Sequence, residues 1–382
     1  MSRDIQELRT EIDQIDRQIV ALLKQRLDTA NEVAEYKRER NLPVLDSNRE
    51  QALMQKISEQ AGEEMSPYIR SIYHAMLSNS RSYQNVKLGR ATEIYNSIRS
   101  ALNNTPNLFP QRTRVACQGV QGAYAQIACS RLFKQPEIQY CQNFEDVFDA
   151  VERGECQYGV LPIENSTAGS VHMVYDLMSK YQFYIVRSAR MKISHNLLAK
   201  RGTKLEDIKE VISHEQAISQ SARYLNDLGV KVTRVRNTAV AAQMVAESDR
   251  SDLAALSSRY CADLYNLEMV EENVQDRDNN YTRFICISKQ HEIYPGADKT
   301  SMVVTTNHQP GSLSALLAKF YGLGINVQKL ESRPIPGREF EFMFYFDIEE
   351  SVYAPEMETL FQVLEVDCER LRYLGTYHEV IV

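Results

Sequence analysis

Residues 5–37 of this 382-residue chain read IQELRTEIDQIDRQIVALLKQRLDTANEVAEYK, and this stretch sets the fold of the N-terminal region. Its large apolar residues recur every three or four positions, the spacing of a helix with one packing face. They are Ile5, Leu8, Ile12, Ile15, Ile19, Leu22 and Val33. A single helix of about 35 residues needs a packing partner along its length. The stretch therefore predicts a long helix and favours a dimer.

Two cations interrupt this packing face. Arg26 stands where the next large apolar residue is expected, and Lys37 lies beside the same face. The two positions are separated by roughly 16 Å of helical rise, so both side chains can reach one small ligand. A cation on a packing face is costly unless it meets an anion. An anion site inside a helical bundle is one interpretation, and a charge that sets coiled-coil register is the other.

A further cation, Arg9, lies about 25 Å from Arg26 along the helix, so an antiparallel second chain would have to deliver it. Downstream, residues 46–50 (DSNRE) have the pattern of a capped helix start. A third helix is expected to open with Ser66 as N-cap and Pro67 at its first position. Its apolar face continues into Ser80 and Gln84. Such a set of polar groups would suit a rigid dianion that carries a hydroxyl.

The rest of the chain shows two other patterns of predicted secondary structure. β-rich runs alternate with helical patterns from about residue 113 to 289, which predicts α/β units with parallel strands. The last 83 residues follow the order β-α-β-β-α-β. We therefore predict three domains, at residues 1–100, 113–289 and 300–382, with linkers at 101–112 and 290–299.

Composition excludes several classes of protein. The net charge is −7 and no long basic run occurs, so no nucleic-acid partner is expected. No stretch approaches the ~20 apolar residues of a membrane helix, and the N-terminus lacks a secretory pattern. We expect a cytoplasmic protein with no membrane association. The seven cysteines form no CxxC or Cys/His cluster. Neither a metal nor another cofactor is therefore expected.

Residues 1–90 resemble the all-α class of chorismate mutase that occurs fused to prephenate dehydratase. The resemblance is carried by LRxxIDxID at 8–16, LLKQR at 22–26, the Lys37 position, DxNRE at 46–50 and SxxxQ at 80–84. It implies that carboxylates of the substrate are held by Arg26, Arg49 and the partner chain's Arg9. It also implies that Lys37 and Gln84 bind the ether oxygen, and that Asp46, Glu50 and Ser80 orient the substrate.

The α/β region resembles prephenate dehydratase, which has a two-lobed fold like that of periplasmic binding proteins. The matching motifs are GVQGAY at 119–124, PIENSTAGS at 162–170, SHEQA at 213–217 and NYTRF at 280–284. PIENSTAGS follows a strand and precedes a helix, a place where backbone N–H groups bind anions. The first motif departs from the commoner family form, because Ala123 replaces a Thr or Ser.

The resemblance assigns the key dehydratase role to Thr282, beside Arg283, which would hold a substrate carboxylate. The secondary candidates for substrate binding are Glu164, Asn165, Ser166, Gly169, Ser213 and Gln216. His214 lies in the third motif, where a structural role is about as frequent as a catalytic one.

Residues 300–382 resemble an ACT regulatory domain, an α+β ferredoxin-like module. The resemblance implies an allosteric phenylalanine site formed by Gly311, Ser312, Leu313, Glu331, Ser332, Arg333 and Pro334. Ser312 stands where the family usually has Ala. A dimerisation module without ligand is the alternative.

Taken together, these regions predict a bifunctional enzyme that converts chorismate to prephenate and prephenate to phenylpyruvate, with inhibition by phenylalanine. A dehydratase with a degenerate helical dimerisation domain, or a non-catalytic amino-acid sensor, are the alternatives. Arogenate as a second dehydratase substrate stays open, and so do oligomers larger than a dimer.

Overall fold

The computed structural model describes residues 3–88 and 93–382 and divides the chain into two compact units. Unit 1 comprises residues 1–99 and 302–372, and unit 2 comprises residues 100–301 and 373–382. The region predicted as helical and most of the region predicted as the C-terminal module thus share one unit. The predicted linker at 101–112 begins inside a helix, α3 (Glu93–Asn104), and ends on the first residue of strand β1.

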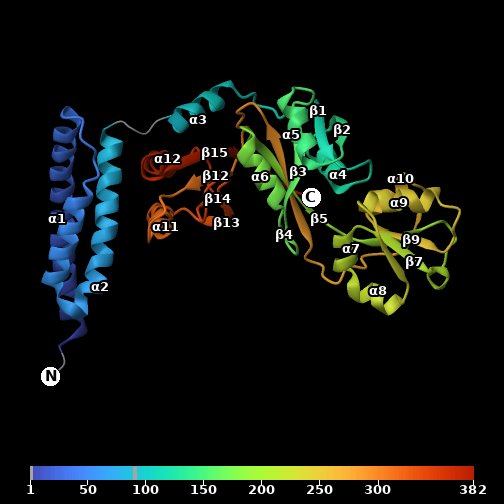
Figure 1. The fold of residues 1–382 in the computed structure, drawn as a ribbon, viewed down its shortest axis with the longest axis horizontal. Helices are drawn as coiled ribbons and strands as arrows, with labels where there is room; N and C mark the ends of the chain where they lie inside the picture. The colour runs from blue at the N-terminus through green and yellow to red at the C-terminus, as the bar shows by residue number, and fades with distance from the viewer. Residues whose placement is uncertain (1–2, 89–92) are drawn as a thin grey trace. The chain divides into compact units, whose positions relative to one another are not determined.

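Unit 1 begins with a long helical hairpin, in which α1 (Ile5–Glu39) and α2 (Ser47–Lys87) lie side by side (Figure 1). Only Ala34 of α1 is buried, whereas Ile12 is 56% and Leu22 63% exposed. The predicted start of a third helix at Ser66 is wrong. The backbone leaves helical geometry earlier, at Gly62 (φ 70°, ψ 167°), and helix continues from there through Pro67. Glycine accepts this positive φ without the steric cost that a Cβ would bring.

The remaining part of unit 1 belongs to a four-stranded sheet with two helices. Along the chain the elements are β12 (Lys299–Thr305), α11 (Ser312–Gly322), β13 (Val327–Pro334), β14 (Phe342–Ile348), α12 (Pro355–Asp367) and β15 (Arg370–Tyr377). The strand order across the sheet is β13-β14-β12-β15. Strand β13 pairs antiparallel with β14. It lies at one edge of the sheet, and its residues alternate between half-buried and exposed.

The larger sheet of unit 2 has seven strands in the order β16-β5-β11-β3-β1-β2, with β4 pairing with β3. They are β1 (Arg112–Gln118), β2 (Gln135–Cys141), β3 (Tyr158–Asn165), β4 (Gly169–Ser170), β5 (Tyr184–Lys192), β11 (Tyr281–Ser288) and β16 (Glu379–Ile381). Helix α4 (Tyr124–Leu132) packs on one face, while α5 (Phe144–Glu152) and α6 (His172–Lys180) cover the other. Both faces are therefore buried, as expected for parallel strands with crossover helices.

The smaller sheet of unit 2 has the order β10-β6-β9-β7-β8. Its strands are β6 (Asn196–Ala199), β7 (Glu210–Ser213), β8 (Lys231–Arg234), β9 (Leu253–Ser257) and β10 (Glu268–Glu271). Its helices are α7 (Glu215–Gln220), α8 (Ala222–Leu228), α9 (Thr238–Glu247) and α10 (Arg259–Leu264), with a 3₁₀ turn at Leu205–Asp207. The chain passes between the two sheets twice, after β5 and before β11, so unit 2 has two lobes joined by two crossovers.

The C-terminal strand β16 joins the larger sheet, where it pairs in parallel with β5. Its predicted place was the C-terminal module, so residues 379–381 correct that boundary. Gly375, just upstream, allows the close approach. A Cβ at this position would lie 2.1 Å from the carbonyl oxygen of Ile185, so no other residue fits without a backbone shift.

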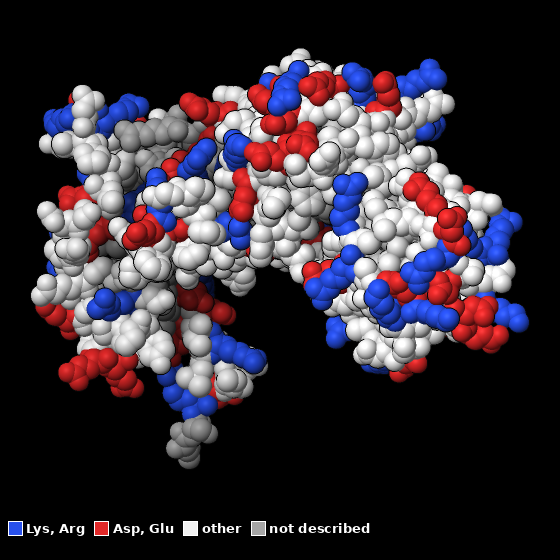
Figure 2. All heavy atoms as spheres, turned by 45° about the vertical axis from the view of Figure 1, so that its right-hand side comes forward, with Lys and Arg blue, Asp and Glu red and all other residues white. Residues whose placement is uncertain are grey.

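Within the described residues, no helix is both long and apolar enough to cross a bilayer. On the face shown in Figure 2, basic and acidic side chains intermingle over the surface, and no single sign dominates a large area. This mixture agrees with the modest net charge of −7.

Candidate active sites

A cavity of about 590 Å³ lies in unit 2, and both of its sheets contribute to the wall. All four predicted motifs reach it, together with the first crossover and the start of α9. The residues that these segments contribute to the wall lie within the stretches 118–125, 162–171, 193–195, 214–220, 236–238 and 282–284. Sequence motifs that lie far apart in the chain therefore converge on one site.

Asn165, at the end of β3, organises the polar part of this wall. Its amide nitrogen donates to Thr282 Oγ1 (2.9 Å) and to Asn280 Oδ1 (2.8 Å). Its amide oxygen accepts from the backbone N–H groups of Thr167 (3.0 Å) and Ala168 (2.9 Å). The side chain is 6% exposed. These partners fix the amide orientation, because the nitrogen faces acceptors and the oxygen faces donors.

Thr282 is the residue that this network presents to the cavity. It pairs with Asn165 across the β3–β11 ladder, next to a register shift between Arg283 and Phe284. Because Thr282 Oγ1 accepts a hydrogen bond from Asn165, its own proton remains available for another acceptor. The structure thus places a hydroxyl that is free to donate on the wall of the predicted dehydratase site.

His195 and Gln220 were not among the predicted site residues, yet both lie on the wall. The His195 Nε2 and Gln220 Oε1 atoms are 2.8 Å apart, and Asn280 also donates to Gln220 Oε1 (2.9 Å). Gln220 Nε2 donates to Thr167 Oγ1 (2.7 Å), which identifies Oε1 as the acceptor and Nε2 of His195 as the donor. Burial lowers the pKa of His195, with an opposing effect from Gln220, so the imidazole is neutral at pH 7.

Arg283 does not lie on the cavity wall. Side chains alternate along a strand, so Arg283 projects to the face opposite Thr282. There it pairs with Glu164, with 3.6 Å between Nη2 and Oε2. Glu164 is likewise outside the wall. The predicted contact of these two residues with substrate is therefore corrected to an ion pair beside the site.

The other predicted dehydratase residues divide into two groups. Gly169, His214 and Gln216 line the cavity. Ser213 does not, because its fully buried hydroxyl donates to the carbonyl of Leu256 (2.7 Å). Ser166 closes the turn instead, since its hydroxyl donates to the carbonyl of Asn279 (2.6 Å) and accepts from the N–H of Tyr281 (2.9 Å). Neither serine lines the cavity.

The cavity is suited to anions. Residues at the N-termini of three helices of nine or more residues, α4, α6 and α9, line it. Backbone N–H groups in the first turn of a helix lack helical acceptors and attract negative charge. Arg236, just before α9, adds a full positive charge to the same wall. The turn RNT at 236–238, between a strand and a helix, is the sequence signal that identifies this segment.

In the helical hairpin, the two cations on the packing face are both partly buried. Within the described residues, the Nη1 atom of Arg26 is buried and has no hydrogen-bond partner. Lys37 Nζ donates to the carbonyl of Val44 (2.7 Å) in the loop after α1. Neither cation forms an ion pair in the part of the chain that the structure describes. A buried guanidinium nitrogen without an acceptor favours a bound anion.

The start of α2 carries three further predicted residues. The Asp46 carboxylate accepts from the N–H of Arg49 (3.0 Å) and so caps the helix. The side chain of Arg49 is exposed, and Glu50 pairs with Arg81 (2.5 Å). The Asp46 carboxylate is thus bonded to the backbone, and Glu50 is paired with Arg81, which was not among the predicted site residues.

Ser80 and Gln84 lie one turn apart on α2, and both are buried. Gln84 Nε2 donates to Ser80 Oγ at 3.3 Å. Arg9 is exposed on α1. The structure of one chain therefore leaves the predicted mutase residues only partly assembled.

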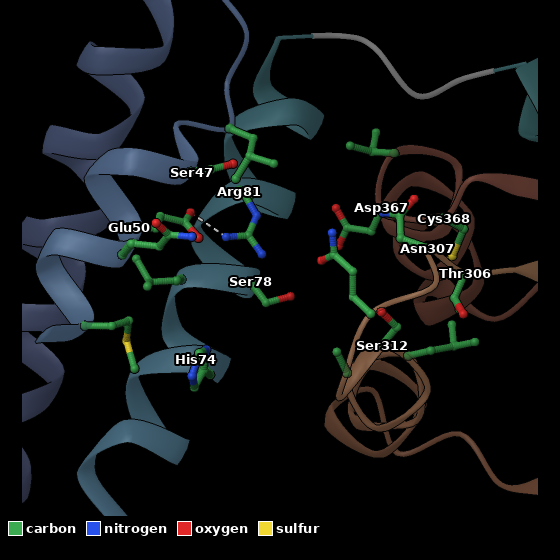
Figure 3. A pocket seen from close by; sticks show the side chains of 18 of the residues that line it. Ser47, Glu50, His74, Ser78, Arg81, Thr306, Asn307, Ser312, Asp367 and Cys368 are labelled. Atoms are coloured by element: carbon green, nitrogen blue, oxygen red, sulfur yellow. Dashed lines mark hydrogen bonds and ion pairs between the residues drawn. The ribbon is translucent and has the colours of Figure 1, made fainter. Parts of the chain in front are cut away.

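A second cavity, of about 920 Å³, lies within unit 1 beside Glu50 and Arg81. Figure 3 shows Ser47, Glu50, His74, Ser78 and Arg81 of α2 on one side, and Thr306, Asn307, Ser312, Asp367 and Cys368 on the other. Nearby, Lys319 pairs with Asp367 and donates to Ser82 Oγ (3.2 Å). Ser312, a predicted effector residue, thus shares a cavity with a predicted mutase residue.

The other predicted effector residues lie at two places. Gly311 caps α11 with a left-handed backbone (φ 85°), and Leu313 is half-buried in the first turn. Glu331, Ser332, Arg333 and Pro334 form the end of β13. Across residues 3–88 and 93–382, no group of three or more His, Cys, Asp or Glu side chains is arranged to hold a metal ion.

Comparisons with known proteins assign families to two of these regions. Residues 8–85 match the chorismate mutase type II family, and residues 115–292 match the prephenate dehydratase family. A bifunctional chorismate mutase/prephenate dehydratase of Enterobacter agglomerans is 30% identical over 97% of this chain and 95% of its own length. An Arabidopsis thaliana protein, the chloroplastic arogenate dehydratase/prephenate dehydratase 1, is 37% identical over 70% of this chain and 72% of its own.

Among solved structures, a prephenate dehydratase from Arthrobacter aurescens in complex with L-Phe is similar, with a TM-score of 0.63 and 26% identity. The match covers 69% of this chain and 90% of that one. The family matches and the full-length relative thus span the helical hairpin and the two-lobed unit.

Proposed function

The chain belongs to the family of bifunctional chorismate mutase/prephenate dehydratases, and from this premise we propose how each region acts. The helical hairpin rearranges chorismate to prephenate. The two-lobed unit then converts prephenate to phenylpyruvate in the biosynthesis of phenylalanine. The two steps use separate sites, at least one of which lies wholly within unit 2.

The dehydratase reaction loses a ring hydroxyl and the ring carboxylate. The ring C–OH bond and the bond to the carboxylate break, water and CO₂ leave, and the ring becomes aromatic. One proton must reach the departing hydroxyl, and it is taken up from solvent, because outright loss of the Thr282 proton would leave an alkoxide. Thr282 assists by donating a hydrogen bond to that hydroxyl. The Asn165–Thr282 hydrogen bond is the observation that carries this assignment, because it directs the Thr282 proton away from Asn165. Helix N-termini and Arg236 on the wall suit the two carboxylates of prephenate.

The mutase step is a pericyclic rearrangement, so no nucleophile is needed. Catalysis depends on holding the reactive conformer and on stabilising negative charge at the ether oxygen. The buried Nη1 of Arg26 supports this role, together with Lys37 and Gln84. We assign Arg49 and Arg9 to the substrate carboxylates, with Arg9 supplied by a second chain.

We infer a homodimer formed through α1. The apolar packing face is exposed in one chain, with Ile15 and Ile19 each at 47% exposure. Burying such a face along a helix of 35 residues would be strongly favourable. An antiparallel partner would bring its Arg9 beside Arg26, as the spacing of the two residues requires.

We infer that the C-terminal module is a ferredoxin-like ACT domain that binds phenylalanine. The order β-α-β-β-α-β and the sheet order β13-β14-β12-β15 support this fold. The left-handed Gly311 at the start of α11, where backbone N–H groups can bind a carboxylate, supports an amino-acid site, to which we also assign the strand end at 331–334. We also infer a cytoplasmic enzyme, because all seven cysteines are free thiols.

Both activities are tested together on the purified full-length chain. Chorismate consumption and phenylpyruvate formation are measured separately, with and without phenylalanine. We expect turnover in both assays and inhibition of phenylpyruvate formation by phenylalanine. Dehydratase activity without mutase activity would instead indicate a degenerate helical dimerisation domain, and binding of phenylalanine without turnover would indicate a sensor.

A further inference from the structure

The permanent charge on the wall of the dehydratase cavity is positive only. Arg236 lies on this wall and forms no ion pair within the described residues. Among the wall residues that the structure describes, none is an Asp or a Glu. The site therefore offers a ligand one permanent positive charge and no permanent negative charge.

The carboxylates directly next to wall residues in the chain are all paired with cations. Glu145 follows the wall residue Phe144, and it pairs with Lys180 at 2.5 Å. Glu164 precedes the wall residue Asn165, and it pairs with Arg283 at 3.6 Å. Glu215 precedes the wall residue Gln216, and it pairs with Arg234 at 3.0 Å. Each carboxylate already has a cation, so none is available to a ligand without loss of that pair.

The other polar groups on the wall are mostly neutral donors or helix N-termini. His195 is 3% exposed, and burial lowers its pKa, so it contributes no positive charge at neutral pH and no negative charge at any pH. The N-termini of α4, α6 and α9 add partial positive charge. An ammonium group in this cavity would meet no counter-ion and would be repelled by Arg236.

We propose that Arg236 determines the substrate specificity of the dehydratase by holding the side-chain carboxylate of a 2-oxo acid and disfavouring the corresponding 2-amino acid. This inference rests on the proposed function. Prephenate has a carbonyl next to the side-chain carboxylate, whereas arogenate has an ammonium group at the same carbon. If Arg236 binds the carboxylate, the ammonium lies about 6 Å or less from the guanidinium, where like charges repel appreciably.

Specificity is measured on the full-length chain with prephenate and arogenate as substrates. We expect kcat/KM to favour prephenate by about a hundredfold, the scale of one unscreened like-charge contact at a protein surface. Arg236→Gln should lower kcat/KM for prephenate about tenfold or more, mainly through KM, because it removes ground-state binding of the carboxylate. The same variant should change kcat/KM for arogenate less than about threefold, so that the preference shrinks.

Arg201→Gln is the matched control. Arg201 is exposed, forms no ion pair within the described residues and is not on the wall, so both substrates should keep their wild-type constants. Arg236→Lys should recover part of the prephenate activity, and mutase turnover in the same samples reports intact protein. A wild-type chain that prefers arogenate, or an Arg236→Gln chain that loses both activities equally, would overturn the proposal. Absence of turnover with either substrate would instead overturn the proposed function.

Discussion

The helical hairpin and the two-lobed unit reach their sites in different ways. In unit 2 the cavity, its hydrogen-bond network and its cation all come from one chain. In the hairpin, the apolar face of α1 is exposed, Arg9 lies far from Arg26, and a guanidinium nitrogen of Arg26 is buried without a partner. Two sheets with helices on them bury a core alone, whereas two helices cannot bury both faces. One site is thus a property of the fold, and the other, we infer, is a property of an assembly.

The largest loss of activity should come from a substitution in the dehydratase cavity of unit 2, which one chain forms by itself. Thr282→Val keeps the shape of the side chain and removes the hydroxyl, so dehydratase kcat should fall about 10²–10³-fold. Mutase turnover in the same preparation should not change, since Thr282 lies in unit 2. Separate assays of phenylpyruvate formation and chorismate loss check both statements.

Ser213→Ala is the control for this substitution. It also removes a buried hydroxyl hydrogen bond in unit 2, but away from the cavity wall. We expect a loss of about 1 kcal/mol in the free energy of unfolding with kcat nearly unchanged. If Thr282→Val retained kcat within about threefold, the hydroxyl would not assist the departure of the ring hydroxyl.

In the hairpin, Arg26→Met should lower mutase kcat/KM about 100-fold, because the cation that binds the substrate is lost. Stability should stay the same or rise, since a buried guanidinium nitrogen without an acceptor is removed. Mutase kinetics check the loss of activity, and thermal unfolding of the same variant checks the stability. Arg17→Met, an exposed position on the same helix, is the control. A loss of both activity and stability would mean that Arg26 has a structural role.

Mixing two defective chains tests whether the mutase site is shared. Arg9→Ala and Arg26→Ala should each be nearly inactive as mutases alone. Co-refolded in equal amounts, they should recover about one quarter of wild-type activity, because half of the dimers are mixed and each holds one intact site. If a mixture shown to contain mixed dimers recovered no activity, Arg9 and Arg26 of different chains would not share one mutase site.

The smallest expected effect concerns the pH dependence of unit 2. Burial lowers the pKa of His291 from 6.5 to about 4, and its ring stacks on Tyr184 with centroids 4.3 Å apart. The unfolded chain binds a proton more readily than the folded chain between these two values. The contribution of His291 to stability is therefore greatest above pH 6.5 and falls as the pH drops toward 4. We expect His291→Phe to reduce this acid loss by about 1 kcal/mol, as measured by thermal unfolding at pH 7 and pH 5. An unchanged difference between the two pH values would exclude His291 as its source.

The sequence correctly predicted which segments of the chain form the dehydratase cavity, but it was less successful in predicting which of their side chains face that cavity. All four dehydratase motifs contribute to one cavity, yet Arg283, the neighbour of Thr282, projects to the other face of β11. Alternation along a strand decides this, and it cannot be used until the strand and its facing cavity are both known. His195 and Arg236 were missed because each lies outside the recognised motifs, and only the crossover after β5 and the turn before α9 bring them to the wall.

Three features can be read from the amino-acid sequence alone: the helical period of residues 5–37, the alternation of strands and helices after residue 113, and the polar motifs at chain turns. These are local properties, set by side-chain spacing and turn chemistry. Tertiary structure decided that Asn165 aims its amide nitrogen at Thr282, that Gly62 rather than Ser66 interrupts α2, and that residues 379–381 join β5. Those outcomes depend on contacts between residues far apart in the chain, whose energies no short stretch of sequence contains.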